Sequence, residues 1–523
     1  MPFVILLFNF MPHAYFSYVD TTSIPTSPIA HHMTIQANPE PLINDSRLKV
    51  EVVFRGIKFP TSMAFLAPND ILVLEKNNGT VQRIVNGKML PHPLLHVNNI
   101  VNDSERGMLG IAIAKRENIT RNVTADVFLY YTEAVRSSTT TNYTPDTTTN
   151  TISRTRVTPN NSTSITPTPT PTSTPITTPI TTTSTKTTTT TTTTKTITTN
   201  TQTIRNRLYQ YELVNDKLIN PKMLLDLPGN PGVYNTPDHV GGKILIGQDK
   251  NVYVAIGDVG GHRTQAININ SGPYPDGTAG ILRITKDGQP APNNPLGGGY
   301  PQNLYYAYGI RNIFGMDFDP LTGKLWDTEN GPNYGDEINL VEPGFNSGWE
   351  KVQGIWSSTP PNNNFPGSIT MYPDNLTDFG SKGKYRSPEL SWYNTVAPTA
   401  LKFLSSDKLG KEYKNNMFVG DFDNGNIYNF PLNKNRTGLA IVYLQSKNMV
   451  NSNDELRTRI FGHGFGGITD IQVGPDGYLY ILSLYAGGDN CNDLFPDIPC
   501  VPYKSSVQGT IFRVAPINRQ MMS

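Results

Sequence analysis

The sequence predicts an all-β protein: a six-bladed β-propeller of four-stranded antiparallel blades with a long disordered Thr-rich loop insertion. Three observations support this fold class. Gly (44) and Pro (42) are abundant and charged residues make up only 16%, a composition typical of turn-rich chains and unlike helical bundles. One strand–turn–strand pattern recurs along the chain. Helical periodicity is nearly absent.

The chain begins with a predicted N-terminal tail, residues 1–45. Residues 3–10 are apolar and have the length of the core of an export signal, too short to span a bilayer, but no Lys or Arg precedes them. Two interpretations of this run therefore stay open, an export signal and an apolar tail. Ten Asn-x-Ser/Thr sequons, the acceptor motif for N-glycosylation, follow. Cys491 and Cys500 lie nine residues apart, and two interpretations stay open: one disulfide that closes a short loop, or two buried thiols. Together these features favour an extracellular or cell-surface location.

Residues 137–203 are predicted to be a low-complexity insertion, because 35 of the 65 residues from 139 to 203 are Thr. Such a stretch has too little apolar surface to offset its ordering entropy. The flanking segments 125–132 and 207–213 both have strand patterns. We expect them to be neighbouring strands of one sheet, so that the propeller consists of residues 46–136 and 204–516.

Six copies of one pattern support the propeller. In each copy, a small or apolar segment leads through a Pro, Asp, Asn or Gly turn into a β-rich run. The copies lie at 63–75, at 108–113 with 127–130, at 244–258, at 316–326, at 400–403 with 416–419, and at 471–482. Further short strands are predicted at 81–85, 281–284, 427–430 and 510–514. Four-stranded units repeated radially make a propeller.

Charge and cysteine content exclude several functions. Lys and Arg total 43 and Asp and Glu total 42, so no net positive field attracts nucleic acid. Two cysteines cannot form a zinc cluster or a disulfide scaffold. No segment has the length and apolarity of a transmembrane helix. The remaining class is a protein that acts on, or binds, molecules from solution.

Three polar segments are candidate functional loops. Asp238 precedes His239, and a carboxylate beside a histidine can orient it as a base; a lone loop histidine is otherwise a surface residue. Arg311 can bind an anion or tie down a loop carbonyl. Residues 329–338 offer carboxylates and turn carbonyls suited to Ca²⁺, or a surface turn with solvated acids.

Two other motifs do not fit their usual functions. Residues 462–467 match a dinucleotide-binding fingerprint, but a strand pattern follows instead of a helix. Residues 421–426 begin like a calcium loop, but its twelfth position is Leu432, where a bidentate Glu is needed.

The candidate loops also carry a family resemblance, from about residue 53 to 514 outside the insertion. Segments 104–112, 238–243, 308–312 and 328–332 with 336–340 resemble, in order, motifs of the soluble quinoprotein sugar dehydrogenases (glucose/sorbosone and aldose sugar dehydrogenases). The resemblance implies a six-bladed propeller that holds pyrroloquinoline quinone (PQQ) and Ca²⁺. It also implies oxidation of an aldose at C1, with an external electron acceptor as partner.

The resemblance implies roles for individual residues. His239 would be the general base, with Asp238 beside it and Asp258 at the substrate rim. Arg311 and Asn312 would contact the quinone oxygens, and Glu105 would lie near the cofactor. The carbonyls of Gly331 and Pro332 would bind the cofactor's calcium, and Glu337 a second, structural calcium.

The sequence departs from the family pattern where cations are expected to hold the carboxylates of PQQ. Asp423 stands where the family has Lys, and Gly467 and Thr469 stand at the two Arg positions. Lys402, Lys411 and Lys414 lie on nearby loops and are candidates to replace them, which the sequence alone does not decide. Two alternatives to a dehydrogenase therefore stay open, a cofactor-free propeller that binds glycans or proteins and a calcium-dependent, lactonase-type hydrolase.

Overall fold

The computed structural model describes residues 40–120, 123–143, 195–230, 232–233, 236–355, 374–441, 448–484 and 508–517. Short β-rich runs cut by Gly, Pro and Asn turns make this part of the chain almost wholly β. Its helical turns are the 3-10 helices η1 (Gln265–Ile267), η2 (Gln302–Leu304) and η3 (Asn453–Arg459). The predicted export signal, most of the Thr-rich stretch, and Cys491 with Cys500 lie outside the described residues.

The described strands form six sheets. The first contains β3 (Pro60–Ala67), β4 (Asp70–Glu75), β5 (Thr80–Val85), β6 (Lys88–Met89) and β7 (Leu95–His96). The second contains β8 (Met108–Thr120), β9 (Val123–Tyr143), β10 (Lys195–Val214) and β11 (Lys217–Pro228). The third contains β12 (Ile244–Ile246), β13 (Val252–Ile256), β14 (Gly280–Ile284), β15 (Tyr305–Tyr308), β19 (Phe345–Asn346) and β20 (Lys384–Tyr385).

The other three sheets follow in chain order. The fourth contains β16 (Ile313–Phe318), β17 (Leu325–Glu329), β18 (Asp336–Val341), β21 (Leu390–Trp392) and β25 (Met449–Val450). The fifth contains β22 (Pro398–Phe403), β23 (Met417–Asp421), β24 (Ile427–Phe430), β26 (Ile460–His463) and β1 (Leu42–Ile43). The sixth contains β27 (Ile468–Val473), β28 (Leu479–Ser483), β29 (Gly509–Pro516) and β2 (Leu48–Ile57).

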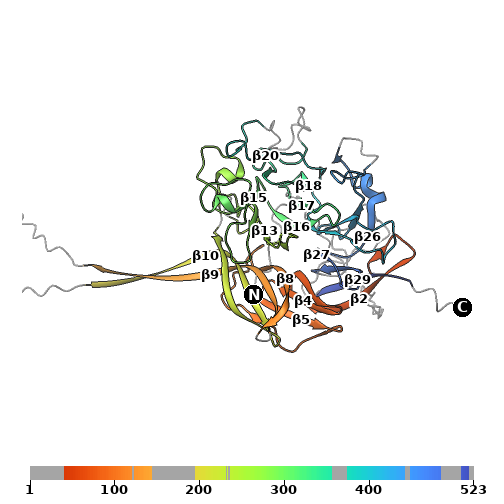
Figure 1. Cartoon of the computed structure of the whole chain (residues 1–523), viewed down its shortest axis with the longest axis horizontal. Helices are drawn as coiled ribbons and strands as arrows, with labels where there is room; N and C mark the ends of the chain where they lie inside the picture. The colour runs from red at the N-terminus through yellow and green to blue at the C-terminus, as the bar shows by residue number, and fades with distance from the viewer. Residues whose placement is uncertain are drawn as a thin grey trace, which may run out of the picture. The chain divides into compact units, whose positions relative to one another are not determined.

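The sheets are arranged around a common centre (Figure 1). One strand of each sheet contacts a strand of the next, in the order β3, β8, β12, β16, β22, β27 and back to β3. The strands β2 and β29, from opposite ends of the described chain, pair antiparallel in the last sheet. The predicted all-β propeller is therefore confirmed.

The sheets differ from the predicted four antiparallel strands. Only two of the six sheets have four strands, and the others have five or six. Two-residue strands account for the additions, and some of them pair parallel, as β15 does with β19 and β21 with β25. A free sheet edge has unpaired N–H and C=O groups, which a passing loop can satisfy. In this way β1, which the prediction placed in the N-terminal tail, pairs with β26.

Apolar side chains fill the spaces between neighbouring sheets. They form six buried clusters, and each cluster joins residues of two adjacent sheets. Between the fifth and sixth sheets, for example, Phe418 and Ile427 pack with Ile471 and Ile481, and all four are 0% exposed. The core is thus distributed around the ring, and the loops at the ends of the strands are left to build sites.

The chain divides into two units, Met1–Val135 with Thr203–Ser523, and Arg136–Gln202. As expected, the strands that flank the Thr-rich segment are neighbours, β9 and β10. Both strands continue into the predicted insertion, to Tyr143 and from Lys195, which was expected to be loop. Thr is β-branched and suits extended backbone, which explains the longer strands. No described helix is long and apolar enough to cross a membrane.

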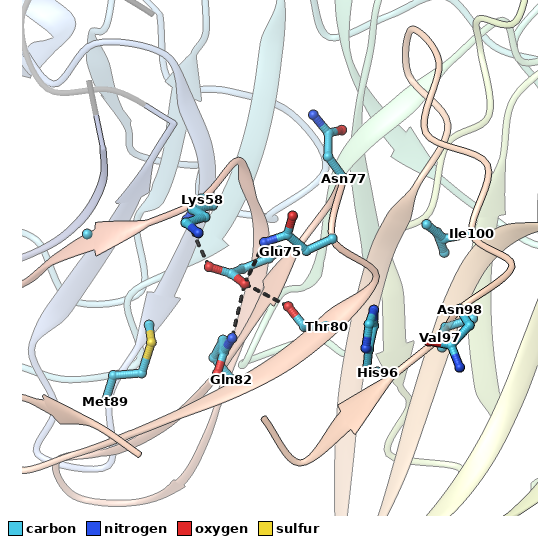
Figure 2. Close-up of a pocket in the computed structure, with 12 residues that line it drawn as sticks. Lys58, Glu75, Asn77, Thr80, Gln82, Met89, His96, Val97, Asn98 and Ile100 are labelled. Carbon is cyan, nitrogen blue, oxygen red and sulfur yellow. Dashed lines mark hydrogen bonds between the residues drawn. The ribbon is translucent and has the colours of Figure 1, made fainter. Parts of the chain in front are cut away.

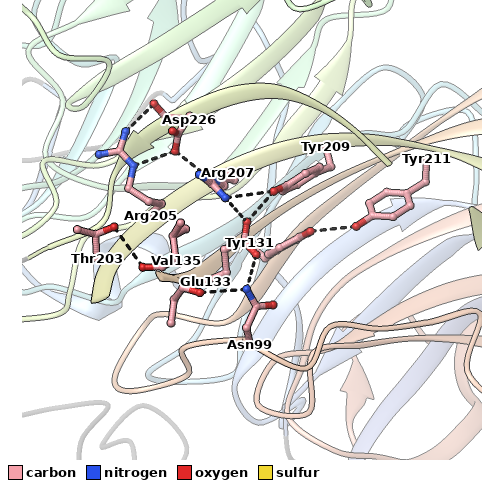
Figure 3. A network of polar contacts seen from close by, with 11 residues as sticks. Asn99, Tyr131, Glu133, Val135, Thr203, Arg205, Arg207, Tyr209, Tyr211 and Asp226 are labelled. Carbon is pink, nitrogen blue, oxygen red and sulfur yellow. Dashed lines mark hydrogen bonds and ion pairs between the residues drawn. The ribbon is translucent and has the colours of Figure 1, made fainter. Parts of the chain in front are cut away.

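Partly buried polar contacts link the strands of the second sheet beside the insertion (Figure 3). Glu133 on β9 accepts hydrogen bonds from Arg207 (2.9 Å) and Tyr209 (2.7 Å) on β10. Arg207 also donates to Asp226 on β11 (2.9 Å), and Asn99 donates to Glu133 (2.7 Å). These contacts fix the three strands where the chain enters and leaves the Thr-rich segment.

Candidate active site

A histidine and a carboxylate are in contact beside the third sheet, in the loops that precede β12 and follow β13. His239 lies in the loop before β12, and Asp258 follows β13, which pairs with β12. His239 Nδ1 lies 2.7 Å from Asp258 Oδ1, and the His239 side chain is 11% exposed. A Cβ at position 257 would come within 2.1 Å of the His239 carbonyl, so Gly257 is required for this approach. With Nδ1 donating to the carboxylate, Nε2 has the free lone pair.

Asp258 is fully buried and has further donors. Trp349 Nε1 donates to Oδ2 at 2.7 Å, and the Gly261 N–H donates to Oδ1 at 3.1 Å. Burial acts to raise the pKa of this carboxyl, but the nearby charges of His239 and Arg311 and the Trp349 hydrogen bond outweigh it and hold the pKa below its usual value. Asp258 is therefore a carboxylate that fixes the orientation of the imidazole.

Glu105 joins the histidine loop to the next segment of the site. Its Oε2 accepts hydrogen bonds from the backbone N–H of His239 (2.8 Å) and from Asn312 Nδ2 (3.0 Å). Burial raises the pKa of Glu105, and the charge of Asp238 adds to this effect, while His239 and Arg311 oppose it. The Glu105 carboxyl group thus links the loop of His239 to the loop of Asn312.

Asp238 forms no hydrogen bond or ion pair with the imidazole ring, although it precedes His239 in the sequence. Its Oδ1 accepts a hydrogen bond from the Ser104 hydroxyl. The backbone φ of His239 is 60°, in the left-handed region, so the two neighbouring side chains leave the chain in different directions. The carboxylate on the ring is Asp258, which was expected at the substrate rim.

Arg311 is fixed on both sides. Its Nη1 donates to the carbonyls of Asn330 and Gly331, each at 2.9 Å, and its Cζ lies 5.5 Å from the centre of the Trp349 ring. Its backbone N–H donates to Glu329 Oε1 at 2.7 Å. One of the two predicted calcium-binding carbonyls, that of Gly331, therefore already accepts a hydrogen bond from this guanidinium.

Asn312 completes the contact with the histidine loop. Its Oδ1 accepts a hydrogen bond from the Gly241 N–H at 3.2 Å, and its carbonyl accepts one from the Asn330 N–H at 2.8 Å. The structure therefore brings His239, Asp258, Glu105, Arg311 and Asn312 together through direct contacts. Gly331 joins this group through Arg311, and Pro332 follows in the same turn.

Two buried glutamates face each other across β17 and β18. Glu329 and Glu337 are paired in register, and the Ser347 hydroxyl lies 2.6 Å from Glu329 Oε2 and 3.1 Å from Glu337 Oε2. Burial raises the pKa of Glu337 to about 7 and that of Glu329 well above its usual value. Two adjacent carboxylates in a dry site need a proton or a cation between them.

Unpaired oxygens surround this pair. Both carboxyl oxygens of Asp327, Oδ1 of Asn339 and Oε1 of Gln353 are buried and have no hydrogen-bond partner among the described residues. Asn339 and Gln353 both donate to Glu337, at 3.0 and 3.1 Å. Burial raises the pKa of Asp327 well above its usual value. Over the same described ranges, no three His, Cys, Asp or Glu side chains are arranged to hold a metal ion.

The positions where the resemblance predicts cations are acidic or neutral in this chain. Burial and the charges of Asp421 and Asp336 raise the pKa of Asp423 to about 7. Lys402, one of the expected substitutes, instead forms an ion pair with Asp317 at 3.0 Å. Lys411 and Lys414 lie exposed on the loop before β23.

A buried ion pair lies beside Thr469. Lys243 Nζ is 2.6 Å from Asp470 Oδ1, and the two side chains are 8% and 0% exposed. The Met63 N–H donates to Asp470 Oδ2 at 2.9 Å. The pair joins the first, third and sixth sheets, and the charge of Lys243 is neutralised by Asp470.

A polar pocket of about 580 Å³ lies at the first sheet, outside this group of residues (Figure 2). Glu75 in its wall accepts hydrogen bonds from the Lys58 N–H (3.0 Å), Thr80 Oγ1 (2.7 Å), Gln82 Nε2 (3.0 Å) and Asn78 Nδ2 (3.2 Å). Much of the polar lining is therefore engaged within the protein.

Sequence reasoning missed Trp349, Ser347 and Asp327. Trp349 and Ser347 lie in the loop after β19, which shows no charged motif. Trp349 is one of only four tryptophans in the chain, and this scarcity was the one available signal. Asp327 lies two residues before Glu329, between the predicted repeat at 316–326 and the candidate loop at 329–338, and belongs to neither.

Comparisons with known proteins find similarity to sugar dehydrogenases. The chain matches, over 166 residues at 35% identity, quinoprotein glucose dehydrogenase B of Acinetobacter calcoaceticus, covering 29% of this chain and 33% of that protein. It matches aldose sugar dehydrogenase YliI of Escherichia coli at 24% identity over 257 residues, covering 49% and 60%. The matched part thus spans about one third to three fifths of the length of these relatives.

Solved structures show the same fold. The soluble aldose sugar dehydrogenase of Escherichia coli in its apo form has a TM-score of 0.56 at 17% identity, covering 90% of this chain and all of that one. The PQQ-bound aldose sugar dehydrogenase of Streptomyces coelicolor has a TM-score of 0.50 at 19% identity, covering 91% and 100%. The family model for Glucose / Sorbosone dehydrogenase matches residues 184–489. The chain belongs to the glucose/sorbosone dehydrogenase family.

Proposed function

We propose that this protein is a sugar dehydrogenase that oxidises an aldose, or a related alcohol, at C1 with PQQ and Ca²⁺. The observation that carries the proposal is the group of His239, Asp258, Arg311 and Asn312, which places an oriented base beside a fixed guanidinium and a fixed amide. We also take each of the six sheets as one blade, so that this group lies on loops of two neighbouring blades.

The residues present fit the quinone and the base chemistry of this reaction. Arg311 and the Asn312 amide are hydrogen-bond donors suited to quinone oxygens. Without a ligand, Arg311 Nη1 donates to the carbonyls of Asn330 and Gly331, and Asn312 Nδ2 donates to Glu105. The fit is poorer for the carboxylates of PQQ, because Asp423 replaces a cation and Lys402 is paired with Asp317. We therefore expect binding that is weaker than a fully cationic site would give.

His239 carries the proton transfer. Its Nδ1 proton is held by Asp258, so Nε2 accepts the proton of the sugar C1 hydroxyl. The Asp258 carboxylate stabilises the resulting imidazolium, as in other histidine–carboxylate pairs. When bound, PQQ supplies the acceptor for the hydride that leaves C1 with its electron pair, and the sugar becomes a lactone. Arg311 is placed to stabilise negative charge that develops opposite the base.

Calcium has two candidate positions in this proposal. The carbonyls of Gly331 and Pro332 would hold the ion that accompanies the cofactor. The unpaired oxygens of Asp327, Asn339 and Gln353 around Glu337 are hard donors of the kind that Ca²⁺ binds, and support a second, structural ion.

One observation favours a second candidate function, a propeller that binds a glycan or a protein without cofactor. A carboxylate at position 423 repels an anionic ligand, and the two arginine positions of the family are Gly467 and Thr469. Export from the cytoplasm also remains part of the proposal, on the basis of the sequons and the apolar N-terminal run.

A titration of the purified protein with PQQ in the presence of Ca²⁺, followed by absorbance, tests the proposal. We expect saturable binding and bleaching of the bound quinone on addition of an aldose. Absence of binding at high micromolar PQQ, with calcium still bound, would contradict the dehydrogenase and favour the binding module.

A further inference from the structure

We propose that Trp349 is a positioning residue for this reaction, which joins the carboxylate behind the base to the arginine opposite it. The expected effect on the reaction rate rests on the proposed function. The contacts of Trp349 with Asp258 and Arg311 do not depend on it. Trp349 has no hydrogen bond to His239 among the described residues and is not a predicted site residue.

The indole makes two contacts that no other described side chain combines. Its Nε1 donates to Asp258 Oδ2 at 2.7 Å, and its ring faces the Arg311 guanidinium at 5.5 Å. Cation–π contact of this kind fixes the plane of the guanidinium. Trp349 therefore sets the distance between the base dyad and the arginine.

The indole itself is held rigidly. It is only 2% exposed, its backbone N–H donates to the Gly309 carbonyl at 2.9 Å, and its carbonyl accepts from Asn268 Nδ2 at 2.7 Å. Gly309 lies two residues before Arg311, so the backbone of the tryptophan loop and the arginine loop are tied together as well. A side chain locked by packing and by its neighbours is what precise placement of a reacting group requires.

Loss of the indole N–H has a definite electrostatic consequence. Asp258 Oδ2 is fully buried, and Trp349 is the only side chain shown to donate to it in the described structure. Without this donor the carboxylate charge is less stabilised, so the His239–Asp258 pair binds its proton more tightly. The other charged groups that face the pair are Glu105, Asp238, Arg311 and His262, and the substitution changes none of them.

The test is Trp349→Phe, which keeps an aromatic ring and removes the N–H. We expect the pH midpoint of protonation of the pair to rise, because the carboxylate that faces the imidazole loses a donor and attracts the added proton more strongly. The midpoint is measured in cofactor-free protein by mass-spectrometric hydrogen–deuterium exchange at the His239 C2 position. With PQQ and Ca²⁺, kcat/KM at pH 7 is expected to fall about ten-fold or more, with the acid limb of the pH profile shifted upward.

Trp326→Phe is the matched control. Trp326 is as buried as Trp349, and its Nε1 has no hydrogen-bond partner within the described ranges, so this variant removes an indole N–H that orients nothing. It should leave the His239 midpoint unchanged. An equal shift in both variants, or no shift in Trp349→Phe, would overturn the inference.

A double-mutant cycle tests whether Trp349 acts through Asp258 or through the general packing of the loop. If Trp349 acts through Asp258, it should have little further effect on the His239 midpoint once Asp258→Asn is present. Additive effects would show an unrelated structural role and overturn the inference. A shifted His239 midpoint in a protein that oxidises no sugar would leave the positioning role intact and refute the proposed function instead.

Discussion

Replacing Asp423 by Asn should stabilise the protein, and more so at high pH. Burial, with the charges of Asp421 and Asp336, raises the pKa of Asp423 from 3.8 to about 7. Because the folded-state pKa is the higher one, the folded protein binds the proton more tightly, and stability is lost as pH rises from about 4 to about 7. The pKa shift is about three units, and each unit corresponds to about 1.4 kcal/mol. Ionisation of Asp423 therefore lowers the free energy of unfolding by at most about 4 kcal/mol at pH 8, and by about 2 kcal/mol at pH 5.5.

Urea unfolding of the wild type and of Asp423→Asn in calcium-free buffer measures this difference. The variant is expected to gain free energy of unfolding at both pH values, with the larger gain at pH 8. Asp407→Asn is a suitable control, because Asp407 is an exposed acid on a loop of the same sheet, with its Lys414 partner 4.0 Å away. An equal gain at pH 5.5 and 8, or a loss at pH 8, would refute the assignment of Asp423 as a destabilising, partly buried carboxylate.

Three further predictions concern the cofactor, the base and calcium. Asp423→Lys should tighten PQQ binding about ten-fold or more, since charge-assisted hydrogen bonds contribute roughly 1.5–3 kcal/mol; an unchanged Kd by absorbance titration would contradict this. His239→Ala should abolish dye reduction while calcium binding, followed by calorimetry, persists; retained activity would exclude the proposed base. Asp327→Asn should raise the Tm in calcium-free buffer, by removing a buried acid, and remove the Tm gain that Ca²⁺ gives the wild type; a calcium effect of wild-type size would exclude Asp327 as a ligand.

Much of the fold was predictable because strand periodicity and turn residues are local signals. The recurring pattern around residues 244–258, for instance, became β12 and β13 with the expected hairpin. The two-residue strands were not predictable. They depend on a free edge such as that of β26, which exists only once the sheets have formed, so Leu42 and Ile43 carried no signal of their own.

The site residues that lie in short, distinctive sequence motifs were predictable. His239 and Arg311 stood out from the sequence because each lies in a distinctive loop, and the structure brings these loops together. The partner of the histidine was misassigned to Asp238, because proximity in sequence suggested contact. The ring instead reaches Asp258, 19 residues later, through strand pairing that places the ends of two strands side by side.

The base with Arg311 and the region around Asp423 depend on different interactions. The affinity for PQQ and the rate of the chemical step can therefore be changed separately. Asp258, Glu105 and Trp349 hold the base and the arginine through contacts within the protein, so that this geometry does not require a bound cofactor. The acidic position 423 lies outside these contacts and acts on an anionic ligand through its charge. A change at Asp423 should therefore alter the PQQ concentration needed for half-saturation and leave the rate at saturation nearly unchanged. A change at Trp349 should do the reverse, because it disturbs the placement of the base while leaving the charge around the cofactor as it is.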